Sequence, residues 1–248
     1  MPRISLRDDP ECIQRLTIGA RGVGSVERMK RSPWLTAPVL VVVGLAALVL
    51  FLPFPGSLSV VLFDATAPVT STLPGIDVPA LAGLLALAAL LVAALLFAWR
   101  TDVARFAAGA AATVGAPLAY LVSEGVKLLV AQDRPCRALA SVAECPPVGD
   151  WSFPSNHSTV AFALFAAIVV AAGHGWMPWA GALLAVVVAC ARVAEGVHYP
   201  HDVAAGALLG IAVAFSASAA LRRPVLLASR WAATHRRNAA LDRTTIRR

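Results

Sequence analysis

Residues 78–99 read VPALAGLLALAALLVAALLFAW, an apolar stretch without a charged side chain. A helix that crosses a bilayer needs about 20 apolar residues, because the hydrocarbon core is about 30 Å thick and each residue adds about 1.5 Å. Five further stretches have a similar character, although the fourth and fifth spans are short and need flanking residues. The sequence therefore predicts six membrane-spanning helices: Trp34–Leu52, Val78–Trp99, Phe106–Val130, Val160–Ala172, Met177–Val193 and Val203–Leu221.

The overall composition agrees with an all-α, polytopic membrane protein. Of 248 residues, 58% are hydrophobic and 14% are charged, whereas a soluble domain carries about a quarter charged residues. This excludes an ordinary soluble domain and a disordered chain. Four cysteines in this length exclude a disulfide-dense secreted scaffold. The net charge of +7 does not indicate a nucleic-acid partner, because the basic residues flank the apolar spans.

The distribution of lysine and arginine predicts the orientation. Most of these residues lie in a basic N-terminal tail (1–33), in the short loop around Arg100 and Arg105, and in a basic C-terminal tail (222–248). With a six-span domain over 34–221, all three regions lie on one side of the membrane, which the positive-inside rule makes cytoplasmic. We therefore expect a multi-pass plasma-membrane protein with both termini in the cytoplasm.

The start of the first span resembles a secretory signal, because Met29-Lys30-Arg31 precedes a long apolar run. No clear small-residue cleavage site follows that run, so we expect an uncleaved signal anchor. Met29 is an alternative start of the protein.

Three short polar stretches do not fit the apolar pattern: residues 127–135, 153–158 and 192–202. Each lies at the predicted outer end of a span. Because span parity puts these ends on the same side, the sequence predicts that the stretches meet at the extracytoplasmic face. Ionisable residues at this depth are costly and are usually functional.

The chemistry of these stretches suits a phosphate group. Three cations can hold a multiply charged anion, and two histidines can divide the work of nucleophile and general acid. Asp202 follows His198 by four residues, which puts both on one face of a helical turn where the carboxylate can orient the imidazole. Pro154 before Ser155-Asn156-His157 indicates a tight loop whose N–H groups face an anion at a helix start.

The same stretches resemble the signature of the type 2 phosphatidic acid phosphatase (PAP2) superfamily, K-x6-R-P, P-S-G-H and S-R-x5-H-x3-D. Lys127 to Pro135 fits the first motif, residues 154–157 fit the second, and residues 192–202 fit the third. Two positions depart from it: Asn156 replaces a glycine and Ala191 replaces a serine.

The resemblance implies a six-helix membrane phosphatase that acts through a phosphohistidine. It implies that His198 attacks phosphorus, Asp202 orients His198, and His157 protonates the leaving oxygen. It assigns the phosphoryl oxygens to a set of donors: Lys127, Arg134, Arg192, Ser155 and the backbone at Asn156 and His157. It implies no metal and no other cofactor.

Residues 152–157, SFPSNH, resemble bacterial polyprenyl diphosphate phosphatases within this superfamily. The expected reaction is therefore the cleavage of undecaprenyl or decaprenyl diphosphate to the monophosphate, with phosphatidylglycerol phosphate and phosphatidic acid as alternatives. A non-catalytic transporter or binding protein for anionic lipids is the alternative of another class. Paired histidines favour the enzyme, and a phosphotransferase would share its site. The sequence predicts no oligomeric state.

Several neighbouring residues have open interpretations. Cys136 and Cys145 either form a disulfide or are two free thiols. Glu124 and Glu195 can pair with the motif cations, and His201 has a surface or supporting role. Two histidines and an aspartate also allow a metal site, which three nearby cations disfavour. Gly206 and Gly210 indicate close helix packing.

Overall fold

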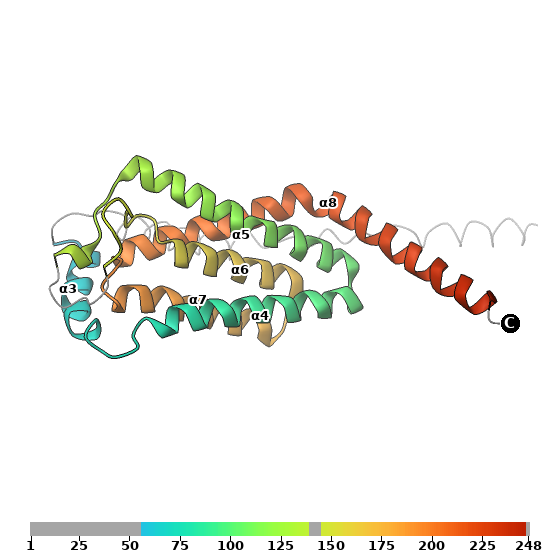
Figure 1. The fold of residues 1–248 in the computed structure, drawn as a ribbon, viewed down its shortest axis with the longest axis horizontal. Helices are drawn as coiled ribbons and strands as arrows, with labels where there is room; N and C mark the ends of the chain where they lie inside the picture. Colours follow the sequence, from blue (N-terminus) through green and yellow to red (C-terminus); the bar gives the residue numbers. More distant parts are fainter. Residues whose placement is uncertain (1–55, 139–144, 247–248) are drawn as a thin grey trace, which may run out of the picture. The chain divides into compact units, whose positions relative to one another are not determined.

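The computed structural model describes residues 56–138 and 145–246, and in these residues it contains helices and loops but no strand (Figure 1). The helices are α3 (Leu58–Thr70), α4 (Val78–Thr101), α5 (Val103–Val130), α6 (Asn156–Ala172), α7 (Trp176–Ala194) and α8 (Pro200–Ile246), with the short 3₁₀ helix η2 (Pro135–Arg137) after α5. The all-α prediction is confirmed.

Four of these helices are long and apolar enough to cross a membrane: α4, α5, α7 and the Pro200–Ala232 part of α8. Helix α6 coincides with the predicted fourth span, but its 17 residues reach only about 25 Å. The predicted first span, Trp34–Leu52, lies outside the described residues. The six-span count is therefore confirmed in part.

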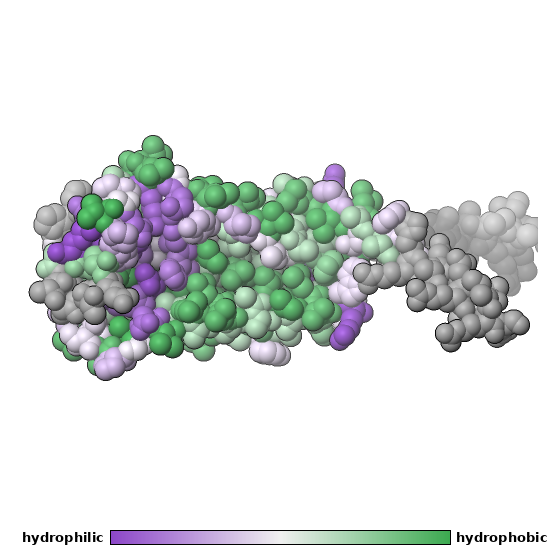
Figure 2. Space-filling model, viewed as in Figure 1, coloured by the Kyte–Doolittle hydropathy of each residue, from purple (hydrophilic) through white to green (hydrophobic). Residues whose placement is uncertain are grey.

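The surface of the bundle agrees with a membrane environment. Figure 2 shows apolar residues over the middle of the helices and hydrophilic residues gathered at the end where α3 and the loops lie. Large side chains such as Leu85 and Leu96 on α4 are more than half exposed. Such exposure is unfavourable in water and favourable against lipid chains.

Helix α3 was not predicted, because its 13 residues are too few for a span. The Ser57 side chain caps its start by accepting a hydrogen bond from the Val60 N–H at 3.4 Å. Its buried residues, Ser59, Phe63 and Ala67, recur every four positions and form one face. Helix α3 contacts α7 and α8.

Small residues let the helices that carry the site approach closely. Helix α8 packs on both α5 and α6. A Cβ atom added to Gly210 would lie 2.1 Å from the Thr159 carbonyl oxygen, and one added to Gly206 would lie 2.5 Å from the Ser155 carbonyl oxygen. The predicted close packing at both glycines is confirmed. It fixes the start of α6 against the start of α8.

Helix boundaries place the polar stretches at one end of the bundle. Helix α5 ends at Val130 and is followed by Ala131 in the left-handed conformation, with φ 47°. Helix α8 begins at Pro200, a residue that fits the first turn because it has no N–H to donate. The helix continues past the predicted end of the sixth span at Leu221 to Ile246.

Candidate active site

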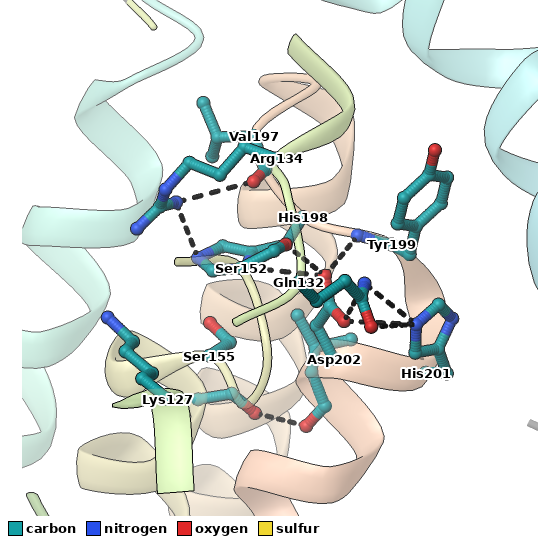
Figure 3. Close-up of polar contacts among 12 residues, drawn as sticks. Lys127, Gln132, Arg134, Ser152, Ser155, Val197, His198, Tyr199, His201 and Asp202 are labelled. Atoms are coloured by element: carbon teal, nitrogen blue, oxygen red, sulfur yellow. Dashed lines mark hydrogen bonds and ion pairs between the residues drawn. The ribbon is translucent and has the colours of Figure 1, made fainter. Parts of the chain in front are cut away.

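The end of α5, the start of α6, the end of α7 and the loops that carry Asp150 and His198 surround a cavity of about 420 Å³, and Leu84 of α4 also lines it. Six of the eight predicted site residues line it: Lys127, Arg134, Asn156, His157, Arg192 and His198. The other two, Ser155 and Asp202, are fully buried beside it. Segments that are 30 to 70 residues apart in the chain thus meet at one place (Figure 3).

His198 lies in the loop between α7 and α8 and is 1% exposed. Its Nε2 atom is 3.1 Å from Arg134 Nη1, and its Nδ1 atom is 3.3 Å from Ser152 Oγ and 3.6 Å from Asp202 Oδ2. The acceptors therefore lie on the Nδ1 side, which favours a proton on Nδ1 and a lone pair on Nε2.

Burial lowers the pKa of His198 to about 4. The neighbouring Asp202 carboxylate opposes this shift, and the positive charges of Arg134 and Arg192 add to it. At neutral pH the imidazole is consequently uncharged, and its Nε2 lone pair faces Arg134 Nη1 at 3.1 Å.

Asp202 is fully buried at the start of α8 and accepts several hydrogen bonds (Figure 3). Oδ2 accepts from Ser152 Oγ and, at 2.8 Å, from the Tyr199 N–H. Oδ1 accepts from Gln132 Nε2 at 3.0 Å and lies 3.1 Å from His201 Nε2. These contacts fix the carboxylate behind His198 and compensate for its burial.

Sequence reasoning did not find Ser152 or Gln132. Both stand two positions before a motif residue, Ser152 before Pro154 and Gln132 before Arg134. The available signal was this proximity to the motifs, which does not indicate a role. Only the fold shows that both side chains turn toward Asp202.

His201 is buried, so the predicted surface role is wrong and the supporting role is the one the structure bears out. Its Nδ1 atom is 2.8 Å from Ser59 Oγ, and its Nε2 atom contacts Asp202. The ring stacks on Tyr199, with 5.3 Å between the centroids. His201 thus links α3 to the carboxylate behind His198.

Asp150 forms ion pairs with two of the three cations, Arg134 and Lys127. Its Oδ1 atom accepts from Arg134 Nη2 at 2.9 Å and from Lys127 Nζ at 3.2 Å. Lys127 also contacts Glu124 Oε1 at 3.2 Å. Burial would raise the pKa of Asp150, but Arg134 and Lys127 together lower it below its usual value. Asp150 was not singled out from the sequence, and it lies directly on the cations expected to hold phosphate.

The third cation, Arg192, pairs with Glu195 one turn further on. Burial raises the pKa of Glu195, and the Arg192 charge opposes that rise. One oxygen of Glu195 and the Nε atom of Arg192 have no hydrogen-bond partner in the described part of the chain. The expected pairing of Glu124 and Glu195 with the motif cations is confirmed.

The start of α6 presents N–H groups toward the cavity end of the bundle. Its first turn has no intrahelical acceptors for these groups, so it favours a negative charge. Ser155 precedes the helix, and its buried Oγ atom has no hydrogen-bond partner among the described residues. The Ser155 N–H donates to the Asp202 carbonyl oxygen at 3.0 Å, which joins α6 to α8.

Asn156 is the first residue of α6 and has an ordinary negative φ, so the freedom of a glycine is not needed there. Its Oδ1 atom accepts from Ser123 Oγ at 2.6 Å, and its Nδ2 group donates to Glu124. The side chain therefore anchors α6 to α5. His157, next along the helix, is half-buried and lines the same cavity as His198.

Cys136 and Cys145 form a disulfide with 5.7 Å between their Cα atoms. The bridge closes the loop that begins at the first motif and ends shortly before Asp150. Of the two interpretations of the sequence, the structure shows the bridged one.

The fold is that of an all-α membrane protein. Two histidines and three cations line one cavity at the end of its helix bundle. Residues 106–225, which include all eight predicted site residues, match the PAP2 superfamily.

Two curated relatives match part of the chain. A bacitracin transport permease protein BcrC from Bacillus licheniformis is 44% identical over 62 residues, which are 25% of this chain and 30% of that protein. An undecaprenyl-diphosphatase from Sulfolobus acidocaldarius is 35% identical over 100 residues, which are 40% of this chain and 48% of that protein. The chain thus spans less than half the length of either relative. No solved structure matches the chain significantly.

Proposed function

We propose that the protein is an integral membrane phosphatase that hydrolyses a polyprenyl diphosphate to the monophosphate. The observation that carries this proposal is the shared cavity of His157, His198 and three cations, within the segment that matches the PAP2 superfamily. Cations alone would suit any anion-binding protein. Two imidazoles on the same cavity supply the nucleophile and the proton donor that a hydrolysis needs.

In the first step His198 Nε2 attacks the terminal phosphorus. A bond forms between Nε2 and phosphorus while the bond to the bridging oxygen breaks, and His157 gives its proton to that oxygen. The lipid monophosphate leaves, and the phosphoryl group stays on His198. Asp202 and Ser152, on the Nδ1 side of the ring, stabilise the positive charge that develops on the imidazole.

In the second step a water molecule attacks the phosphohistidine. His157, now neutral, takes a proton from the water, the bond between nitrogen and phosphorus breaks, and inorganic phosphate is released. His198 returns to its neutral form, which its lowered pKa favours. Both steps use the same two imidazoles in alternating roles.

The phosphoryl oxygens are held by Lys127, Arg134 and Arg192 together with the N–H groups at the start of α6. These donors are fixed by the fold, so they stabilise the charge of the transition state without reorganising. Ser155, whose buried Oγ atom lacks a protein partner, offers one further donor. The proposed mechanism therefore requires no metal ion.

A polyprenyl diphosphate is the proposed substrate, because one partial relative is named an undecaprenyl-diphosphatase. The cavity also suits the geometry of such a lipid. It lies at the end of apolar helices, where a phosphate group can reach polar side chains while its hydrocarbon chain stays in the bilayer. Phosphatidylglycerol phosphate and phosphatidic acid share the phosphate chemistry and are the competing substrates.

We also propose that the site faces the extracytoplasmic side and that both termini are cytoplasmic. The distribution of basic residues supports this orientation. The Cys136–Cys145 disulfide supports it independently, because such bonds persist in oxidising compartments and the bridge lies at the site end of the bundle. Labelling intact cells with a membrane-impermeant reagent at a cysteine introduced at Val148 tests it, and labelling only after lysis would contradict it.

Phosphate release by the purified full chain tests the reaction. The assay runs in detergent with EDTA, on polyprenyl diphosphate, phosphatidylglycerol phosphate and phosphatidic acid. We expect turnover that is fastest on the diphosphate, and a loss of about 10³-fold or more in His198→Ala. His174→Ala is the matched control, because His174 is exposed in the loop between α6 and α7 and should keep full activity. Trapping of an acid-labile, base-stable phosphoryl group on His198 tests the intermediate directly.

Lipid transport without hydrolysis is the second candidate, favoured by the name of the other partial relative, a transport permease protein. The two functions differ in what they release. Liposomes containing the protein and a fluorescent polyprenyl phosphate would show movement between leaflets for a transporter, and His198→Ala would leave that movement intact. Phosphate release without such movement identifies the enzyme.

A further inference from the structure

A second cavity of about 440 Å³ lies beside the polar one, between α5 and α6. Its lining consists of Ala116, Pro117, Tyr120 and Leu121 from α5 and Val160 from α6. None of these residues is charged, and the phenol of Tyr120 is the single polar group among them. We call this cavity the α5–α6 groove.

The α5–α6 groove is continuous with the polar cavity. Tyr120 and Val160 line both spaces. A molecule with its phosphate among Lys127, Arg134 and His198 can therefore extend past these two side chains into an apolar space. Continuity with the site distinguishes this groove from a second apolar cavity, between α3, α7 and α8, which shares no lining residue with the polar one.

The sequence of α5 explains why the groove forms. Gly115, Ala116 and Pro117 follow one another, and the first of them packs so closely on α8 that an added Cβ atom would lie 2.5 Å from Ala214 Cα. Ala116 is nearly buried but short, and Pro117 has a compact ring. Small side chains therefore leave a hollow beside Leu121, which is 63% exposed on the lipid-facing surface.

We propose that the α5–α6 groove binds the phosphate-proximal isoprene units of the substrate's polyprenyl chain. This inference rests on the proposed function and assigns the part of the substrate that the catalytic residues do not touch. The volume of the groove lies within the range of about 300–1,000 Å³ that is typical of small-molecule sites. Its lining matches a hydrocarbon chain, and its position matches the atoms next to the diphosphate.

The α5–α6 groove distinguishes lipids by the shape of their chains, and hydrophobic transfer contributes little to the binding free energy. Bilayer chains are as apolar as the side chains of the groove, so moving a lipid tail from one to the other gains little free energy. A branched, methyl-bearing chain and a straight acyl chain differ in cross-section, so they pack differently against the side chains of α5 and α6 that line the groove. The groove therefore aligns the diphosphate for attack by His198 and favours prenyl over acyl lipids.

Filling the groove tests the inference. Leu121→Trp adds bulk at its lipid-facing side, and Leu85→Trp is the matched control, because Leu85 is equally exposed on α4 and lines neither cavity. We expect Leu121→Trp to raise KM for undecaprenyl diphosphate about tenfold and to leave KM for tail-less pyrophosphate unchanged. Leu85→Trp should change neither value. Equal effects of the two variants, or no effect of either, would overturn the proposal.

Photolabelling gives a second measurement that does not depend on turnover. The probe is a polyprenyl monophosphate with a diazirine on its first isoprene unit, added to the full-length protein in detergent. We expect the label on the α5 peptide that contains Leu121, and a label on Leu62 or Val193 of the other apolar cavity would contradict the proposal. Labelling of α5 without hydrolysis of any polyprenyl diphosphate would refute the proposed reaction and retain the groove. Hydrolysis without labelling of α5 would refute the groove alone.

Discussion

Asp150→Asn should strengthen the binding of inorganic phosphate, because the Asp150 carboxylate contacts two of the donors that we propose for the phosphate. Its Oδ1 atom contacts Arg134 Nη2 at 2.9 Å and Lys127 Nζ at 3.2 Å. In the proposed complex a phosphoryl group replaces these contacts. Asparagine retains the shape and one oxygen but removes the negative charge that competes.

The size of the expected change in affinity follows from the solvent exposure of Asp150 and of the two cations that it contacts. The side chains of Lys127 and Arg134 are 5% and 4% exposed, whereas that of Asp150 is 40% exposed. Exposed ion pairs contribute about 0.2–1 kcal/mol, and hydrogen bonds to charged groups contribute about 1.5–3 kcal/mol. Asp150 is a half-exposed carboxylate with two such contacts, so the contacts should contribute about 1.5 kcal/mol in total, between these two ranges. We therefore expect the Ki for phosphate to fall about tenfold.

The assay is competitive inhibition of phosphate-ester turnover by inorganic phosphate, with Ki measured for the wild type, Asp150→Asn and Asp133→Asn. Asp133 is the matched control, because its carboxylate is exposed and pairs with Arg137 outside the cavity. The thermal unfolding midpoint of each variant in detergent verifies that the fold is retained. An unchanged or higher Ki in folded Asp150→Asn would show that Asp150 orients the cations for phosphate and does not compete with it.

Three further predictions concern packing, pH and the disulfide. Gly210→Ala should lower the free energy of unfolding by about 3 kcal/mol, because the new Cβ atom would lie 2.1 Å from the Thr159 carbonyl oxygen. The control, Gly125→Ala, should be neutral or slightly stabilising, because its Cβ would meet no atom within 4 Å. Equal unfolding midpoints of the two variants would contradict this prediction. Because the pKa of His198 is lowered to about 4, the neutral nucleophile persists in mild acid, so kcat/KM should lose activity from this group only below about pH 5; a loss centred near the ordinary value of 6.5 would indicate a solvated imidazole. Replacing Cys136 and Cys145 together by serine should destabilise the protein by about 2–3 kcal/mol through the freed loop, measured as a lower unfolding midpoint that a reducing agent reproduces in the wild type.

Hydropathy alone predicted most of the helices, and its errors have clear physical causes. The spans over α4, α5, α7 and α8 stand out because transfer into lipid requires a long apolar run. Helix α3 was missed because a length of 13 residues gives no such signal. Its stability comes from contacts with α7 and α8, which a local pattern does not report.

The gathering of the polar stretches was also predicted from the sequence, because alternate ends of successive spans face the same side of a membrane. The cavity that Lys127, Arg134, His157, Arg192 and His198 share agrees with that expectation. The assignment of their chemical roles remains a proposal. Motif spacing identifies residue types that suit phosphate and does not report what else touches them.

The sequence by itself determined a helical membrane protein whose three polar stretches (127–135, 153–158 and 192–202) share one end, because bilayer partitioning acts on each span separately. Only the tertiary structure decided that Asp150 covers two of the cations, that Ser152 and Gln132 fix Asp202 across 50 and 70 positions of chain, and that the α5–α6 groove opens into the site. These contacts join loops and helices that are far apart in the chain. They depend on how closely small residues such as Gly210 let the helices pack. The hydrophobic periodicity of one helix does not indicate the distance between two helices.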